Sequence, residues 1–198
     1  MASNVLFIFS LAIVVLIFYF HDAKATAAGE QKTINKVKAY VTNFLTDDQL
    51  HTICANLSVG IYQMKNTSQL ADDVQTIILN SLTNSQTATI MPIMQSLNRD
   101  FGSLSAAKEA MKPMFTALSN NLTPVLEQMQ AKDVDWTNEG KGQTACIAQQ
   151  YRMIDSFFTV TRTKTIITRM KEATPPKNWT YIYNDLHDVV FFAKYVTA

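Results

Sequence analysis

Histidine, cysteine and acidic side chains are the residues of this chain that could catalyse a reaction or hold a metal. His51 and His187 lie far apart in the sequence, and neither has a Ser or Cys at a spacing typical of nucleophilic catalysis. A run that begins at Asp133 resembles the start of a calcium loop, but Asn138 stands where that loop needs a glycine. The chain also lacks a glycine-rich phosphate loop and a His-Glu-x-x-His motif. We therefore expect no enzyme, no cofactor and no metal site.

Methionine gives the apolar part of the sequence its character. Met91 and Met94 lie about one helical turn apart on either side of a proline, and Met111 and Met114 repeat this arrangement. A proline inside a helix kinks it, so the helix cannot pack flush against its neighbours. Flexible Met side chains either fill the space that remains or line a cavity for an apolar ligand. Both interpretations stay open at this point.

Length and composition limit the fold and the partners. The 198 residues allow one domain of ordinary size, and 47% of them are hydrophobic, which suits a packed core. The net charge of +1 gives no basic field for nucleic acid. Five Gly and five Pro are few for the tight turns of a β-sandwich or barrel. The composition therefore predicts an all-α protein, a compact bundle of about seven to eight amphipathic helices.

Hydrophobic periodicity places these helices along the chain. Thr46 and Thr83 each precede a Gln by three residues, a spacing typical of a capping box at a helix start. Gly102 predicts one helix end and Pro175 another. We expect a loop at 132–142, and the segment 179–196 suits a helix or a strand equally well. The predicted helices cover residues 31–45, 50–64, 69–82, 84–101, 105–118, 124–131 and 143–171.

The N-terminus carries the pattern of a secretory signal peptide. Val5 to Phe20 is an uncharged, almost wholly apolar run, shorter than the roughly 20 residues of a membrane span. Small residues around Ala25 predict cleavage there, with Ala28 as the alternative. No Lys or Arg precedes the run, so an uncleaved anchor is the other interpretation. We expect residues 1–25 to be a signal peptide, residues 26–198 to be a single secreted domain, and no later segment to span a membrane.

Export would expose the chain to oxidation and to glycosylation. Cys54 and Cys146 are the only cysteines, and two cysteines in a secreted chain predict one disulfide. The alternatives are two separate buried thiols or a bridge between chains. Four Asn-x-Ser/Thr sequons are candidates for N-glycosylation, at Asn56, Asn66, Asn121 and Asn178.

Several segments share helix lengths and cap positions with a known family of proteins. The run from Val37 to Leu50, with its Leu-Thr-Asp-Asp cap, is similar to the opening of the secreted fatty-acid- and retinol-binding proteins of nematodes. The stretch from Asp73 to Leu97 is similar to their central helical hairpin, and the one from Lys108 to Leu126 to their later helices. The resemblance covers about half the chain and rests on helix lengths and cap positions. It implies a helical fold and an apolar ligand such as a fatty acid or retinoid.

Two functional hypotheses follow from these observations. The first is a secreted helical carrier that holds a fatty acid, retinoid or other apolar molecule between helices, a site that needs no polar motif. The second is a secreted, glycosylated interaction protein that binds an extracellular, receptor or host partner and holds no small ligand. For the first hypothesis, the residues expected to line the ligand are Ile78, Ile90, Met94, Met111, Phe115, Ile154 and Phe158.

Overall fold

The computed structural model describes residues 44–157, 159–178 and 180. This part of the chain holds helices and no strand, which confirms the predicted all-α class. The signal segment 1–25, residues 31–43 of the predicted helix 31–45 and most of segment 179–196 lie outside the described residues, and Phe44 and Leu45 form a turn before α3. The helices that the structure describes are α3 (Asp47–Tyr62), α4 (Thr67–Ser81), α5 (Asn84–Phe101), α6 (Leu104–Asn138), α7 (Gln143–Phe157) and α8 (Val160–Ala173).

Side-chain caps fix where the first three of these helices begin. Both predicted capping boxes are present: Thr46 with Gln49 opens α3, and Thr83 with Gln86 opens α5. A third box, Asn66 with Gln69, opens α4 two residues earlier than the predicted helix. In each box the cap side chain accepts from the third backbone N–H, and the Gln side chain accepts from the cap N–H. Gly102 ends α5 in the left-handed conformation (φ 78°), as predicted.

α6 is one helix where the sequence predicted two helices and a loop. Pro113 and Pro124 both lie inside it, and the expected loop at 132–142 begins only after Asn138. A proline removes one backbone hydrogen bond, but α6 packs against each of the other described helices, and this burial outweighs that loss. The polar end of α6 continues as helix and packs against α7, where Asp133 is buried and accepts from Gln150.

The predicted long helix 143–171 is two helices, α7 and α8. Thr159 caps the second one, and its side chain accepts from the backbone N–H of Arg162. The threonine-rich sequence hid this start because Thr also occurs within helices, where its hydroxyl bonds back to the preceding turn. α8 ends at Ala173, just before the paired prolines that predicted the stop.

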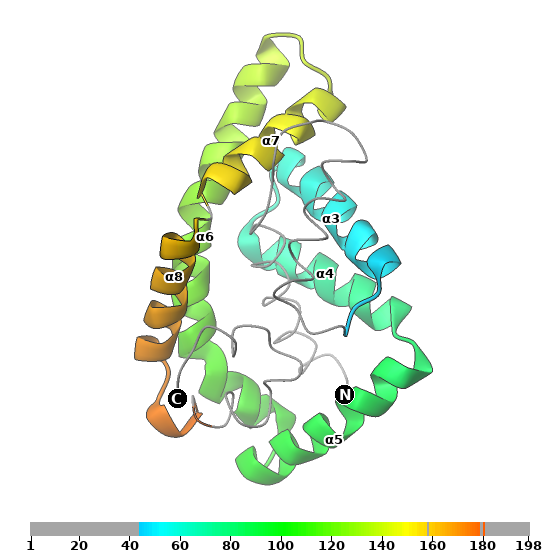
Figure 1. Cartoon of the computed structure of the whole chain (residues 1–198), viewed down its shortest axis with the longest axis vertical. Helices are drawn as coiled ribbons and strands as arrows, with labels where there is room; N and C mark the ends of the chain where they lie inside the picture. Colours follow the sequence, from blue (N-terminus) through cyan, green and yellow to red (C-terminus); the bar gives the residue numbers. More distant parts are fainter. Residues whose placement is uncertain (1–43, 158, 179, 181–198) are drawn as a thin grey trace.

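The long helix α6 is the spine on which the others are arranged (Figure 1). α8 lies alongside it, α7 follows the C-terminal end of α6 and packs against both α3 and α6, and α5 leads into the N-terminal end of α6. α3 and α4 pack against each other and against α6. A single buried core joins all six helices, with fully buried side chains such as Ile53, Leu70, Met111 and Leu118.

Methionine serves mainly as core filler in the described residues. Met111, Met114, Met129 and Met170 are at most 2% exposed. Met91 is 46% exposed, so the two Met pairs beside prolines do not share one environment. No described helix is both long enough and apolar enough to cross a lipid bilayer.

The predicted disulfide between Cys54 and Cys146 is wrong. Both thiols are buried and no bond joins them. Cys54 lies in the middle of α3, whereas Cys146 lies in the first turn of α7. The Cys146 sulfur faces the turn that follows α6, 3.9 Å from the Lys141 carbonyl oxygen and 4.0 Å from the Thr137 hydroxyl. The structure thus agrees with the alternative of two separate buried thiols.

Candidate functional site

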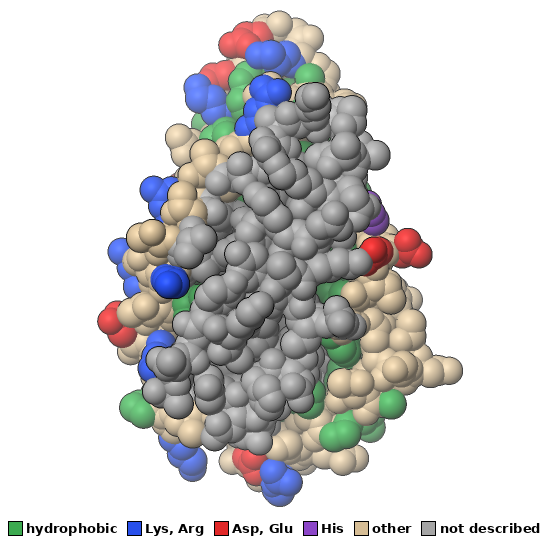
Figure 2. Space-filling view, viewed as in Figure 1, with side chains coloured by type: hydrophobic (Ala, Val, Ile, Leu, Met, Phe, Trp, Pro, Cys, Tyr) green, Lys and Arg blue, Asp and Glu red, His purple; other side chains and the backbone are tan. Residues whose placement is uncertain are grey.

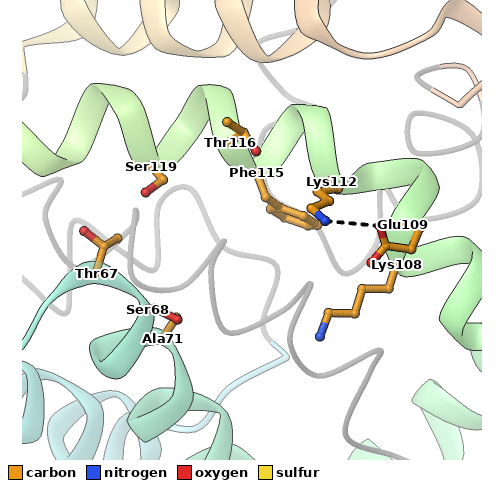
Figure 3. Close-up of a pocket in the computed structure, with 9 residues that line it drawn as sticks. All are labelled: Thr67, Ser68, Ala71, Lys108, Glu109, Lys112, Phe115, Thr116 and Ser119. Atoms are coloured by element: carbon orange, nitrogen blue, oxygen red, sulfur yellow. Dashed lines mark hydrogen bonds and ion pairs between the residues drawn. The ribbon is translucent and has the colours of Figure 1, made fainter.

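A cavity of about 390 Å³ lies between the start of α4 and the first half of α6. This volume falls within the range of small-molecule sites in proteins. Thr67, Ser68 and Ala71 line it from α4. Figure 3 shows the α6 side chains reaching from the opposite wall. They are Lys108, Glu109, Lys112, Phe115, Thr116 and Ser119.

The cavity has an apolar wall and a cationic rim. Phe115 and Ala71 are buried and present ring and methyl carbon to the cavity, and hydroxyl groups of Ser and Thr surround them. Lys108 and Lys112 lie one turn apart on α6, one turn or more before Phe115. Two lysines against Glu109 give the described lining a net positive charge. The arrangement suits a molecule with an apolar body and an anionic end.

The ion pair at the rim is weakly held. Lys112 Nζ lies 3.3 Å from Glu109 Oε2, and the two side chains are 69% and 64% exposed. Exposed pairs of this kind stabilise a protein by only about 0–1 kcal/mol. Lys112 could therefore exchange Glu109 for an anionic ligand at small cost.

The residues predicted to line a ligand share one core, but only Phe115 lines this cavity. Ile78, Ile90, Met111 and Ile154 are at most 3% exposed and pack within the core. Met94 is half-buried against that core. Phe158 lies outside the described residues. In the structure these core positions contact protein side chains, and their role as ligand lining stays a prediction.

The charged residues of the cavity were missed from the sequence. Hydrophobic periodicity selects apolar positions, so it passes over a lysine that lies at the edge of an apolar face. One signal was present: Lys108, Lys112, Phe115 and Ser119 follow three- and four-residue steps and share one face of a helix. The α4 wall had no such signal, because Thr67 and Ser68 look like ordinary helix-start residues.

A buried polar pair joins α6 to α7 away from this cavity. The Asp133 carboxyl is 1% exposed, and its Oδ2 accepts from Gln150 Nε2 at 2.6 Å. Burial raises the pKa of Asp133, and the Gln150 hydrogen bond opposes this with a smaller effect. Within the described residues, no three His, Cys, Asp or Glu side chains lie close enough together to hold a metal ion.

The sequons differ in how far they are buried. Asn56 and Asn66 are exposed, on α3 and at the cap of α4, and Asn56 Nδ2 donates to the Thr52 carbonyl oxygen at 2.9 Å. Asn121 and Asn178 are half-buried, and each Nδ2 donates to a main-chain carbonyl of α6: Ala117 at 2.6 Å and Ala110 at 3.0 Å. Because a glycan is bulky, the burial of Asn121 and Asn178 makes these two positions less compatible with glycosylation in the folded state than Asn56 and Asn66.

Comparison with known proteins places the chain in a family. No curated protein and no solved structure matches it significantly. The family described as "Uncharacterized protein B0228.1-like" matches residues 5–185. The match begins with the apolar N-terminal run and extends beyond α8. Because it covers nearly the whole chain, this protein belongs to the B0228.1-like family.

Proposed function

We propose that the protein is a secreted carrier of a fatty acid, retinoid or similar apolar molecule, bound in the cavity between α4 and α6. In this proposal residues 1–25 direct export and residues 26–198 fold as one compact helical bundle. The observation that carries the proposal is the cavity of about 390 Å³, with Phe115 on its wall and two lysines at its rim. The resemblance to nematode fatty-acid- and retinol-binding proteins supports the same ligand class.

Binding would draw on both parts of the cavity. Each methylene group that leaves water stabilises the complex by about 0.8 kcal/mol, so a long acyl chain needs few polar contacts. The carboxylate of a fatty acid would lie at the rim beside Lys108 and Lys112, where solvent keeps its desolvation small. Retinol has no charge, so its binding would depend on the apolar wall and on hydrogen bonds of its hydroxyl group, and not on the lysine charges.

Titration with an environment-sensitive fluorescent fatty acid tests the proposal. We expect a blue-shifted, saturable signal that oleate and retinol displace. Ser119→Phe places a ring in the cavity and is expected to weaken both ligands at least tenfold, or about 1.4 kcal/mol. The double variant K108Q/K112Q should weaken oleate about two- to fivefold and leave retinol unchanged.

Lys132→Gln is the matched control for the lysine variants. Lys132 also lies on α6 and pairs with an acid three residues away, Asp135 at 3.0 Å, but it does not line the cavity. Unchanged binding by S119F would place the ligand elsewhere. No saturable signal from folded, lipid-free protein would reject the carrier function itself.

The alternative function is a secreted, glycosylated interaction protein without a small ligand. The close packing of Met111, Met114 and Met129 favours it, because these side chains already fill the core. The exposed sequons Asn56 and Asn66 could carry glycans without disturbing that core. Glycan masses at these two positions, together with a negative lipid titration, would make this the working function.

A further inference from the structure

A second cavity lies farther along α6, where α8 packs beside it (Figure 1). Its volume is about 550 Å³, and its position is separate from the cavity assigned to the apolar ligand. Asn121 and Pro124 line it from α6, and Arg162, Ile166 and Arg169 line it from α8. Phe157, at the end of α7, completes an apolar wall with the proline and isoleucine.

Arg162 is held in place by Phe157. Its guanidinium carbon lies 4.5 Å from the centre of the Phe157 ring. Its Nη1 also donates to the Phe157 carbonyl oxygen at 3.1 Å. A guanidinium stacked on an aromatic ring keeps its edge donors available in the plane of the group.

Arg169 is held by an amide rather than by an acid. Its Nη1 donates to Asn121 Oδ1 at 2.5 Å, and the Asn121 amide is itself fixed by its bond to the Ala117 carbonyl oxygen at 2.6 Å. Arg162 and Arg169 lie seven residues apart, so they share one face of α8 about 10 Å apart along its axis. Both guanidinium groups are thus positioned by neutral acceptors.

The charge of this cavity is not balanced by the residues that the structure describes. No acidic side chain lines it, and neither Arg162 nor Arg169 forms an ion pair with a described carboxylate. α8 carries four basic residues and one acid. Figure 2 shows basic side chains spaced along the edge of the molecule where α8 lies. An anion would supply the missing charge.

We propose that this second cavity binds a small organic molecule that carries a phosphate- or sulfate-type oxyanion. Arginine forks bind such oxyanions with two parallel hydrogen bonds, and Thr161 and Thr165 add hydroxyl groups to the lining. A water molecule takes about 30 Å³ in the liquid, and a phosphate or sulfate ion is only a few times larger than water. The cavity of about 550 Å³ therefore has room for an organic group beside the oxyanion. The organic part would lie against Phe157, Pro124 and Ile166.

Calorimetric titration of the full chain with phenyl phosphate and with inorganic phosphate tests this site. We expect phenyl phosphate to bind at one saturable site and inorganic phosphate to bind at least tenfold more weakly. Arg162→Gln and Arg169→Gln should each weaken phenyl phosphate about tenfold. Arg169→Lys keeps the charge but loses the fork, and it should give a smaller loss.

Lys164→Gln is the control, because Lys164 is exposed on the same helix and does not line the cavity. Both arginines are exposed, so the variants should keep the wild-type melting temperature. The proposal is overturned if neither probe binds saturably, or if K164Q weakens phenyl phosphate as much as R162Q and R169Q do. Equal affinity for the two probes would overturn the role of the apolar wall.

Discussion

Gln49 and Gln86 join the starts of α3 and α5 through a reciprocal pair of amide hydrogen bonds. Gln49 Nε2 donates to Gln86 Oε1 at 3.0 Å, and Gln86 Nε2 donates to Gln49 Oε1 at 2.7 Å. Each is also the third residue of its own capping box. Gln49 further donates to the Ser81 carbonyl oxygen at 2.7 Å, and Gln86 donates to that of Phe44. Two local caps therefore form one buried polar cluster.

Gln86→Ala should destabilise the protein by about 2 kcal/mol, because it removes a cap and the buried hydrogen bonds of Gln86 to the Gln49 amide and the Phe44 carbonyl oxygen. Gln69→Ala is the control: Gln69 holds the same place in the α4 box but is exposed, so only about 0.5–1 kcal/mol should be lost. Urea unfolding measures both. Equal losses in the two variants would mean that the amide pair adds nothing beyond capping.

Asp133 is predicted to make stability depend on pH. Burial raises the pKa of its carboxyl in the folded protein above the ordinary value of 3.8, so the folded state binds the proton more tightly. The resulting stabilisation is complete below pH 3.8 and is lost as the pH rises through the folded-state pKa. When ionised, the carboxylate leaves its Oδ1 and Gln150 Oε1 as two buried acceptors without a donor.

Asp133→Asn supplies an amide donor in place of the acid proton. We expect it to raise the unfolding free energy at pH 7 by on the order of 1–3 kcal/mol. The decrease of the unfolding free energy with rising pH above pH 4 should also become smaller. Asp135→Asn is the control, since that side chain is 56% exposed. Urea unfolding between pH 4 and 8 gives the comparison. If the unfolding free energy of D133N depends on pH as steeply as that of the wild type, another group causes the pH dependence.

How much could be foreseen depends on the range of the interactions. The caps at Thr46, Thr83 and Gly102 were predicted because a few neighbouring residues decide them. The continuity of α6 through Pro113 and Pro124 depends on helices packed against it, which no local pattern reports. The same holds for the cavity between α4 and α6. Phe115 was predicted as an apolar lining position, but the α4 wall of the cavity comes from residues about 45 positions away in the sequence.

Gly60 is predicted to be required for the close contact of α3 with α4. A β-carbon at this position would lie 2.6 Å from Leu70 Cδ2 and 3.3 Å from Lys65 Cδ. Leu70 is completely buried and has little room to move. Gly60→Ala gains about 1 kcal/mol in helix propensity, whereas overpacking a core costs about 1–3 kcal/mol. We expect a net loss of about 1 kcal/mol in urea unfolding.

Gly142→Ala is the control for this variant, because a β-carbon there would meet no atom within 4 Å. It should lower the unfolding free energy by no more than about 0.5–1 kcal/mol, through the cap position that Gly142 holds before α7 and not through a clash. A gain in stability for Gly60→Ala would indicate that Leu70 repacks freely and that α3 and α4 are less tightly joined than the structure describes.

The two cysteines are predicted to be thiols in the folded protein. Both are buried, and the Cys146 sulfur lies beside the Lys141 carbonyl oxygen and the Thr137 hydroxyl rather than beside the other sulfur. Reductant should leave the melting temperature unchanged, because no covalent loop constrains the unfolded chain. Alkylation without reductant should be slow in the folded state and should add two groups after denaturation. Denatured protein that accepts no alkyl group, and a melting temperature that falls with reductant, would instead show that the cysteines are joined.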